Sequence, residues 1–494
     1  MRYVLNGIWK LSTPANRYVF IFLLLAFSYG SMFFTDLIGI HVWRQTQTQT
    51  VIETLSRNDG DVFSPRVFQI DATGSRVLRM EFSLMQWLFA QGRLLFGSSV
   101  LVMRIECFLL SLLTLWGFSR LARQVFPLLP LAGFLGAWCL AFSPLFYYYA
   151  INPLPDNFSL CAAVWSLYFL FRFIKTHTLK LWVAHLLLVS LSILTKLPFA
   201  IFGAASLVVA WAFVCQPGPV FRKGVLMGSF LLLLLPALWY LTVIPEWHND
   251  GLKGGLFATR TPLAILADIF VHHLISTLPE LIVNYASLLA FLAGLWVSGT
   301  ILIQKRLLRL DQKALLAALV AGLLYVVYEL GMIGKEHDYY LFPLVPFILL
   351  TVLAGYRQLL QSPLSGTRYR LLRALAIVGL VISPLTAWLR MQSRWDLNEP
   401  GFDVDYYRYK EQLRAFLPAD AKVITGPDDS HFINLYYLNR TGWTFSESLD
   451  TGFIQQQVIR GARYLITDSA HTPHQYLTTH PVRAFGKLLV IALP

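Results

Sequence analysis

Charge is scarce in this chain of 494 residues, since only 14% of them are Asp, Glu, Lys or Arg, against about 25% in soluble domains. The mean hydropathy is +0.57, which excludes an ordinary soluble protein and predicts an integral membrane protein. Cysteine is scarce too, and every cysteine lies within or beside an apolar run. We therefore predict no disulfide framework among Cys107, Cys139, Cys161 and Cys215.

Internal repeats and low-complexity segments are also lacking. Apolar runs of about 20 residues, the length that crosses the hydrocarbon of a bilayer, recur instead. We predict about eleven transmembrane helices from these runs. They lie at residues 18–35, 98–118, 129–147, 158–173, 181–195, 198–214, 224–243, 281–303, 315–333, 341–355 and 371–389.

Basic residues gather in alternate short loops. They are Arg2, Lys10, Arg17, Arg120, Arg123, Arg172, Lys175, Lys180, Arg222, Lys223, Lys305, Arg306, Arg309, Lys313, Arg357, Arg368, Arg370 and Arg373. Cytoplasmic loops carry such an excess. We therefore expect a multi-pass protein of the inner (cytoplasmic) membrane, with a cytoplasmic N-terminus, an odd number of crossings and a periplasmic C-terminal segment. Topology then explains the net charge of +13, and we predict no nucleic-acid partner.

The predicted fold class is a polytopic α-helical membrane protein with a small C-terminal α/β extracytoplasmic domain. Residues 1–390 form the transmembrane domain and residues 391–494 the C-terminal domain. The first outer loop, 36–97, includes an amphipathic helix at 82–96 that we expect in the membrane surface. Residues 245–280 form a second outer region. The C-terminal domain is predicted to hold helices at 406–416, 430–438 and 453–461, and strands at 422–425, 463–467 and 485–492.

Acidic residues mark the predicted outer ends of several apolar runs. They are Asp36, Glu81, Asp156 and Asp338. Ionisable side chains at membrane depth are expensive to bury, so they are candidates for function. Two carboxylates could bind a divalent cation, or one could take the proton of an attacking hydroxyl, and Glu81 and Asp156 are the preferred pair. The alternative for Asp156 is a helix start after Pro155, where an acid is favourable.

Cations stand at the same predicted face, against the positive-inside trend. They are Arg44, Lys196, Arg260, Lys335 and His337. A phosphate or diphosphate would balance their charge, because Arg and Lys bind phosphate oxygens. The alternatives are pairing with Glu81, Glu336 or lipid headgroups, and for Lys196 a lone ammonium reaching the interface. Tyrosines at this boundary are typical of an aromatic belt, and Tyr340 is the exception we expect.

Several short motifs combine these residues. They are His41-x-Trp43-Arg44-Gln45, Glu81-Phe82, Pro155-Asp156, Leu194-Thr195-Lys196-x-Pro198 and His337-Asp338-Tyr339-Tyr340-x-x-Pro343. With these motifs the whole chain resembles the GT-C superfamily of membrane glycosyltransferases that use a polyprenyl-phosphate sugar donor. The resemblance is to the family 39-like branch, with protein O-mannosyltransferases and the aminoarabinose transferase of lipid A.

The resemblance implies transfer of a sugar, with inversion, from an undecaprenyl-phosphate-type donor to an extracytoplasmic hydroxyl of a glycan, lipid or protein. It implies that Glu81 and Asp156 occupy acidic positions of the site, where a divalent metal ion could bind. Arg44, Lys196 and Tyr340 match positions near the donor phosphate.

One departure from the family concerns the base. The family's first loop begins with an Asp-Glu pair, but alignment on Arg44 puts His41 and Val42 there. Relatives with this variant often have an acid two residues after the glutamine, where this chain has Gln47. The candidate bases are therefore Asp36, His41 and Glu81.

Two other functions stay open on the sequence alone. A transporter or flippase for a lipid-linked anion would carry its polar groups near the bilayer midplane, on discontinuous helices. An inactive scaffold that displays the C-terminal domain would tolerate loss of every outer charge.

Overall fold

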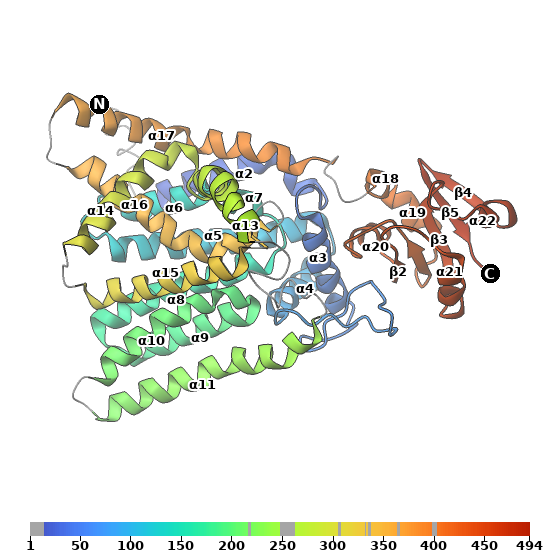
Figure 1. Cartoon of the computed structure of the whole chain (residues 1–494), viewed down its shortest axis with the longest axis horizontal. Coiled ribbons are helices and arrows are strands. Elements are labelled where there is room, and N and C mark those ends of the chain that lie inside the picture. Colours follow the sequence, from blue (N-terminus) through green and yellow to red (C-terminus); the bar gives the residue numbers. More distant parts are fainter. Residues whose placement is uncertain are drawn as a thin grey trace. The chain divides into compact units, whose positions relative to one another are not determined.

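The computed structural model describes residues 14–215, 219–247, 262–304, 308–330, 332–333, 337–362, 366–397 and 403–494. The chain divides into two compact units (Figure 1). The helical unit comprises Met1–Phe34 and Arg104–Ser393, and the mixed unit comprises Thr35–Met103 and Arg394–Pro494. The sequence assigned the first outer loop to the transmembrane domain, whereas its contacts group it with the C-terminal segment.

The helical unit consists of helices and short 3-10 or π segments, two of which, α5 and η8, overlap the mixed unit at residues 100–103 and 394–395. They are α2 (Pro14–Tyr29), η1 (Gly30–Phe34), α5 (Val100–Val125), α6 (Ala132–Ala141), α7 (Pro144–Tyr149), α8 (Pro155–Thr176), α9 (Leu179–Thr195), η2 (Leu197–Ala200), α10 (Ile201–Val214), α11 (Pro219–Val243), η3 (Ile244–Glu246), α13 (Pro262–Asp268), η5 (Ile269–Val283), η6 (Tyr285–Ser287), α14 (Leu288–Ile303), α15 (Leu310–Glu329), η7 (Asp338–Leu344), α16 (Val345–Gln361), α17 (Thr367–Gln392) and η8 (Ser393–Trp395).

Within the described residues, 7 helices are long and apolar enough to cross a membrane. They are Ala15–Phe34, Val100–Val125, Pro155–Thr176, Leu197–Val214, Leu310–Glu329, Asp338–Gln361 and Thr367–Trp395. Shorter apolar helices cover Ala132–Ala141, Leu179–Thr195, Leu231–Glu246 and Tyr285–Ile301. A helical membrane protein is thereby supported, while the count of eleven crossings stays a prediction.

The second outer region, predicted at 245–280, differs from the structure where it is described. From Pro262 onward it is helical, as α13 and the π-helix η5. The apolar helices Leu266–His272 and Leu274–Val283 meet at a bend of 50°. Asp268, His272 and Pro279 interrupt the apolar run, which is why its sequence looked like a loop.

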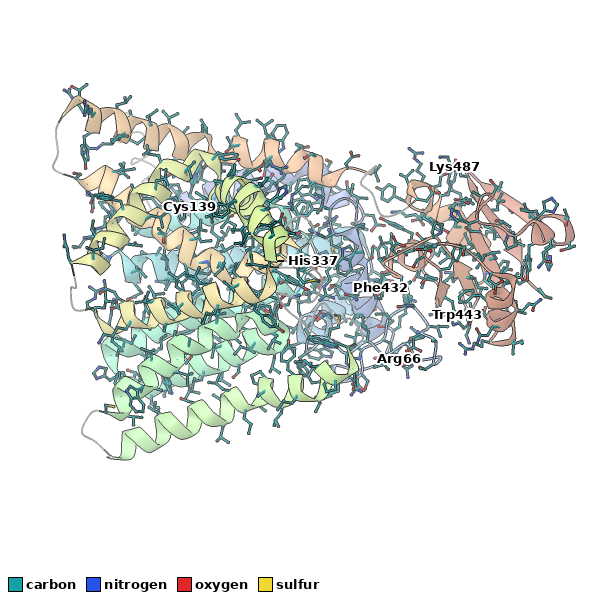
Figure 2. All side chains as sticks on the ribbon, in the orientation of Figure 1. Arg66, Cys139, His337, Phe432, Trp443 and Lys487 are labelled. Atoms are coloured by element: carbon teal, nitrogen blue, oxygen red, sulfur yellow. The ribbon has the colours of Figure 1, made fainter. Side chains whose placement is uncertain are left out.

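The helical unit is a bundle in which α8 packs against α9, α10 against α15 and α14 against α16 (Figure 1). Cys139 of α6 is buried in it (Figure 2). The first residues of α11, α15 and α17 lie at one end of the bundle, at the left in Figure 1. Predicted cytoplasmic residues Arg309 and Arg368 belong to that end, at the starts of α15 and α17.

The mixed unit combines short helices with one sheet. Its elements are α3 (Val42–Ser56), α4 (Leu84–Phe96), α18 (Val404–Arg408), α19 (Lys410–Phe416), β1 (Lys422–Thr425), α20 (Ile433–Leu438), β2 (Gly442–Thr444), α21 (Thr451–Ile459), β3 (Ala462–Asp468), α22 (His474–Thr479), β4 (Val482–Phe485) and β5 (Leu488–Ala492). The strand order is β2-β1-β3-β5-β4, with β1 parallel to β2 and β3, and β5 antiparallel to β3 and β4. Apolar side chains of β1, β3 and β5 form its core with Trp443 and Ile454.

Backbone hydrogen bonds tie the first loop to this sheet. Ile70 N donates to Gly442 O at 2.7 Å, and Gly442 N donates to Phe68 O at 3.0 Å. The loop thus extends the edge of the sheet at β2, which explains why the two stretches form one unit.

Most predicted elements of the C-terminal segment are confirmed. The strands β1, β3 and β5 and the helices α18 to α21 lie where the patterns placed them, while β2, β4 and α22 were missed. The helix predicted at 82–96 is α4. It buries Met85 and Gln86 and exposes Leu94, Leu95 and Phe96, an apolar surface suited to the predicted position in a membrane interface.

Candidate functional site

In the helical unit, Lys196 is the centre of a group of polar and aromatic side chains. Its Nζ lies 3.3 Å from Oδ2 of Asp156, which is 1% exposed. The same ammonium lies 5.4 Å from the ring centroids of both Tyr339 and Tyr340. The Glu329 carboxyl also interacts electrostatically with it. We call Lys196, Asp156, Tyr339, Tyr340 and Glu329 the Lys196 cluster.

Helix ends position the residues of this cluster. Pro155 and Asp156 form the first turn of α8, where proline is tolerated and an acid is favourable. Lys196 has extended backbone between α9 and the Leu-Pro start of η2. Each charge therefore stands at a helix end rather than along an apolar helix.

The segment η7 brings the tyrosines to Lys196. Tyr149 Oη donates a hydrogen bond of 2.7 Å to Oδ1 of Asp338, and both residues are buried. His337, at the start of η7 (Figure 2), lies with its ring 5.2 Å from that of Tyr340. Tyr325 Oη of α15 donates to Tyr340 O at 3.1 Å. The predicted residues Asp156, Lys196, His337 and Tyr340 thus come together.

Sequence reasoning missed Glu329, Tyr325 and the role of Tyr149. A signal for Glu329 was present, since it is an acid inside the apolar run predicted at 315–333, and acids in such runs are functional candidates. Tyr149 offered no signal beyond its place in a Tyr-Tyr-Tyr sequence. Its partner Asp338 is distant in the chain.

In the mixed unit, Arg44 and Glu81 form a buried ion pair. Nη2 of Arg44 lies 2.7 Å from both carboxylate oxygens of Glu81, and the two residues are 4% and 9% exposed. Nη1 of Arg44 donates to Gln47, and Nε2 of Gln86 donates to Glu81 Oε1 at 3.2 Å. These residues line a small cleft with Met80 and Ser83. We call Arg44, Glu81, Gln47 and Gln86 the Arg44 cluster.

The polar helix α3 carries Arg44 in spite of its burial. Its threonines donate their hydroxyls to backbone carbonyls one turn earlier, for example Thr48 to Arg44 O at 2.9 Å and Thr50 to Gln47 O at 2.8 Å. Polar side chains can therefore be buried here without leaving hydroxyl donors unsatisfied. His41, the residue immediately before α3, is 8% exposed and has a left-handed backbone with φ of 58°.

Asp36 pairs with the C-terminal segment. Lys410 Nζ lies 2.5 Å from its Oδ2, Tyr436 Oη donates to Oδ1 at 2.6 Å, and Leu37 N donates to Oδ1 at 2.8 Å. Burial by itself would raise the pKa of Asp36, but the Lys410 ammonium and these hydrogen bonds outweigh burial and lower that pKa below its usual value. Asp36 is thus a charged group with strong partners.

The predicted site residues therefore fall into a group in each unit. Arg260 and Lys335 lie outside the described residues. Among the described residues no group of three His, Cys, Asp or Glu side chains could hold a metal ion, and Glu81 and Asp156 each face a cation. The donor set does not fit a metal, so no chemical step is assigned to one.

Comparison with known proteins gives a family match. The family model described as dolichyl-phosphate-mannose-protein mannosyltransferase matches residues 83–241. That stretch includes Asp156 and Lys196 but begins after Arg44 and Glu81. A comparison of the sequence with curated proteins finds no match.

Solved glycosyltransferase structures share the fold. ArnT from Cupriavidus metallidurans, bound to undecaprenyl phosphate, is 15% identical, with a TM-score of 0.62 over 96% of this chain and 97% of that one. AglB, the oligosaccharyltransferase of Archaeoglobus fulgidus, in complex with an inhibitory peptide and a dolichol-phosphate, is 13% identical, with a TM-score of 0.58 over 91% and 69%. The mycobacterial arabinofuranosyltransferase AftD is 13% identical, with a TM-score of 0.58 over 97% and 40%.

Proposed function

This chain has the GT-C glycosyltransferase fold and matches a GT-C family model over residues 83–241, and we propose that it transfers a sugar from a polyprenyl-phosphate donor to an extracytoplasmic acceptor hydroxyl. The reaction proceeds with inversion at the anomeric carbon. Undecaprenyl phosphate bound to ArnT and dolichol-phosphate bound to AglB support this class of donor. The acceptor belongs to a glycan, lipid or protein at the periplasmic face of the inner membrane.

The observation that carries the proposal is the ammonium of Lys196 beside Asp156 and over two tyrosine rings. A lysine ammonium has three donors, so pairing with one carboxylate leaves donors for a further anion. Asp156 and the rings hold the ammonium in place, and this preorganisation is what makes a cation effective against charge that develops during a reaction. A lipid phosphate is such an anion.

Each cluster then has a role in the reaction. The acceptor oxygen bonds to the anomeric carbon as the bond from that carbon to the phosphate oxygen breaks, and the electron pair leaves with the phosphate. Lys196 balances the negative charge on the leaving phosphate, while Asp156 positions Lys196. The acceptor proton passes to a base, for which Asp36, His41 and Glu81 are the candidates; Asp36 and Glu81 each pair with a cation.

Conservative substitution of the two acids tests the proposal. Membranes that contain the full-length chain are supplied with a panel of radiolabelled polyprenyl-phosphate sugars, and transfer is compared for wild type, Asp156→Asn, Glu81→Gln and Lys196→Ala. We expect each substitution to lower transfer by about 100-fold or more, the effect typical of removing a positioned acid–base or charge-stabilising group.

Matched controls keep the test specific. Asp311→Asn removes an acid at the start of α15 that pairs with the exposed Arg309, and Glu411→Gln removes an exposed acid of α19. Both should transfer sugar at the wild-type rate. Full activity of Asp156→Asn and Glu81→Gln at wild-type protein levels would reject these two residues as part of the site.

A further inference from the structure

A large apolar groove lies in the helical unit, away from the Lys196 cluster. It has a volume of about 1060 Å³ and is lined by α2, α6, the end of α16 and α17. Phe20, Phe27, Trp138, Leu380 and Trp388 are among its apolar side chains. Ligand pockets typically measure about 300–1,000 Å³, so the groove can hold a lipid chain.

The groove extends along much of the bundle. Its lining residues on α17 extend from Arg373 to Trp388, which corresponds to about 22 Å at about 1.5 Å per residue. One leaflet of hydrocarbon is about 15 Å deep, half the thickness of the bilayer core. The groove is therefore longer than one leaflet is deep, and an acyl chain that enters at one end can lie in the groove along the whole length of the chain.

One end of the groove is basic. Arg17 near the start of α2 and Arg373 near the start of α17 line it there, together with Gln361. Among the described residues no acidic side chain lines the groove. Nε of Arg17 is buried without a hydrogen-bond partner in the described part of the chain, whereas Gln361 Nε2 is already committed to Leu128 O at 2.7 Å.

The second arginine shapes this end. Arg373 donates from Nε to Leu359 O at 3.1 Å and from Nη2 to Ser362 O at 3.0 Å. These bonds fix the guanidinium against the end of α16. Such a group has five N–H donors, so further donors stay available to an anion beside Arg17.

The basic end differs from the proposed donor site. Gln361 ends α16, while Tyr340 lies in η7 before α16 begins. The 17 residues of α16 separate the two by about 25 Å. A headgroup beside Arg17 and Arg373 would therefore lie in the opposite leaflet from a phosphate at Lys196.

We propose that this groove is a binding site for an anionic glycerophospholipid, with its phosphate at Arg17 and Arg373 and an acyl chain along α2 and α17. Two guanidinium groups match a phosphodiester through charge-assisted hydrogen bonds. The apolar lining excludes water and matches hydrocarbon. The lipid fills the space between α2, α6 and α17 and stabilises their packing.

Lipid retention in bilayers tests this site. The full-length protein is reconstituted in nanodiscs of equimolar phosphatidylglycerol and phosphatidylcholine, released into detergent, and its retained lipid is identified by native mass spectrometry. Wild type should retain phosphatidylglycerol about tenfold over phosphatidylcholine. Both lipids carry the phosphodiester, but the choline ammonium cancels the negative charge of phosphatidylcholine beside the two guanidinium groups. The Arg17→Ala, Arg373→Ala double variant should lose that preference.

Two matched controls complete the experiment. The Arg172→Ala, Arg368→Ala double variant removes exposed basic residues at helix ends outside the groove and should keep the wild-type preference. Val381→Trp, which fills the groove, should lower total retained lipid, while Val378→Trp on the exposed surface of the same helix should not.

Equal retention of the two lipids by wild type would overturn the proposal, and so would an unchanged preference in the Arg17→Ala, Arg373→Ala variant. Retention of a co-purified polyprenyl phosphate in place of a glycerophospholipid would also overturn it. A preference that the two control variants lose equally would also reject the groove as its cause.

Discussion

At the scale of single residues, the burial of Glu81 depends on Arg44. Removing one partner of a buried ion pair leaves an uncompensated charge and costs about 3–5 kcal/mol, whereas replacing both groups can be nearly neutral. We predict that Arg44→Ala lowers the melting temperature strongly and that Arg44→Ala with Glu81→Gln recovers most of the loss. Thermal unfolding of the purified protein in detergent measures both.

An exposed pair supplies the control for this cycle. Arg66 lies 2.7 Å from Asp59, with side chains 47% and 29% exposed, and such pairs are worth about 0–1 kcal/mol. Arg66→Ala should therefore hardly change the melting temperature. If Arg44→Ala and the double variant unfold at the same temperature, the uncompensated charge is not the cause of the loss.

How far single site residues can be predicted follows from where their partners lie. Asp156 and Lys196 were identified because each interrupts apolar sequence, and they are paired in the structure. The partner of Asp36 could not be predicted, because Lys410 lies in another part of the chain and only the folded mixed unit brings the two together. Glu329 carried a readable signal, an acid inside an apolar run.

At the scale of elements, glycines let α14 and α16 approach closely. A Cβ built on Gly355 would lie 1.6 Å from Ala290 O, and one on Gly294 would lie 1.9 Å from Thr351 O. Small residues drive close helix packing in membranes. We predict that Gly355→Ala forces the helices apart and lowers the melting temperature by several degrees.

A glycine of the same helix pair provides the control. A Cβ added to Gly299 of α14 would meet no other atom within 4 Å, and alanine is the better helix former. Gly299→Ala should leave the melting temperature unchanged or slightly higher. Equal destabilisation by both substitutions would contradict the close-packing argument.

The pair Asp36–Lys410 joins the first loop to α19, and its contribution depends on pH. Because the pKa of Asp36 is lowered in the folded protein, its stabilisation is complete above the ordinary value of 3.8. It disappears as the pH falls through the lower folded pKa. We predict that Asp36→Asn costs about 3–5 kcal/mol at neutral pH, and that the difference from wild type shrinks only in strong acid.

Unfolding curves of both proteins over a range of pH measure this difference. Asp420→Asn is the control, because Asp420 is 77% exposed beside Arg463, and its effect should be small at every pH. A difference between wild type and Asp36→Asn that already vanishes between pH 5 and 7, well above the ordinary value for an aspartate, would contradict the lowered pKa.

Elements with a clear apolar period were predictable, and those without one were not. The helix α4 follows helical spacing, and the strand β1 is a Val-Ile-Thr run before the turn at Gly426, and both were predicted. The helix α3 has almost no amphipathic pattern, because it is buried on nearly all sides and its threonines bond to their own helix. The strand β2 is three residues long, too short for a periodic signal.

At the scale of the whole molecule, the two chain segments that form the mixed unit constrain the transmembrane topology. Residues 35–103 and 394–494 fold as one unit, so both must lie on the same side of the membrane. The chain between them therefore crosses an even number of times. Ten of the predicted crossings lie in that interval, which is already an even number. The bent pair Leu266–His272 and Leu274–Val283 therefore adds no crossing, and its two ends lie on the same side of the membrane.

Cysteine labelling tests this threading. Single cysteines are placed in a Cys215→Ser background, since Cys215 is the exposed native cysteine, at Thr73 and Glu447 of the mixed unit and at Arg172 and Arg368 of the helical unit. With a membrane-impermeant maleimide on intact spheroplasts, we expect labelling at Thr73 and Glu447 and none at Arg172 and Arg368. All four should react after permeabilisation, which controls for accessibility.

Labelling of Thr73 without Glu447 would separate the two halves of the mixed unit, and labelling of Arg172 and Arg368 in intact spheroplasts would reverse the predicted orientation. Only the expected pattern leaves Asp36 and Lys410 on the same side of the membrane, outside the cytoplasm.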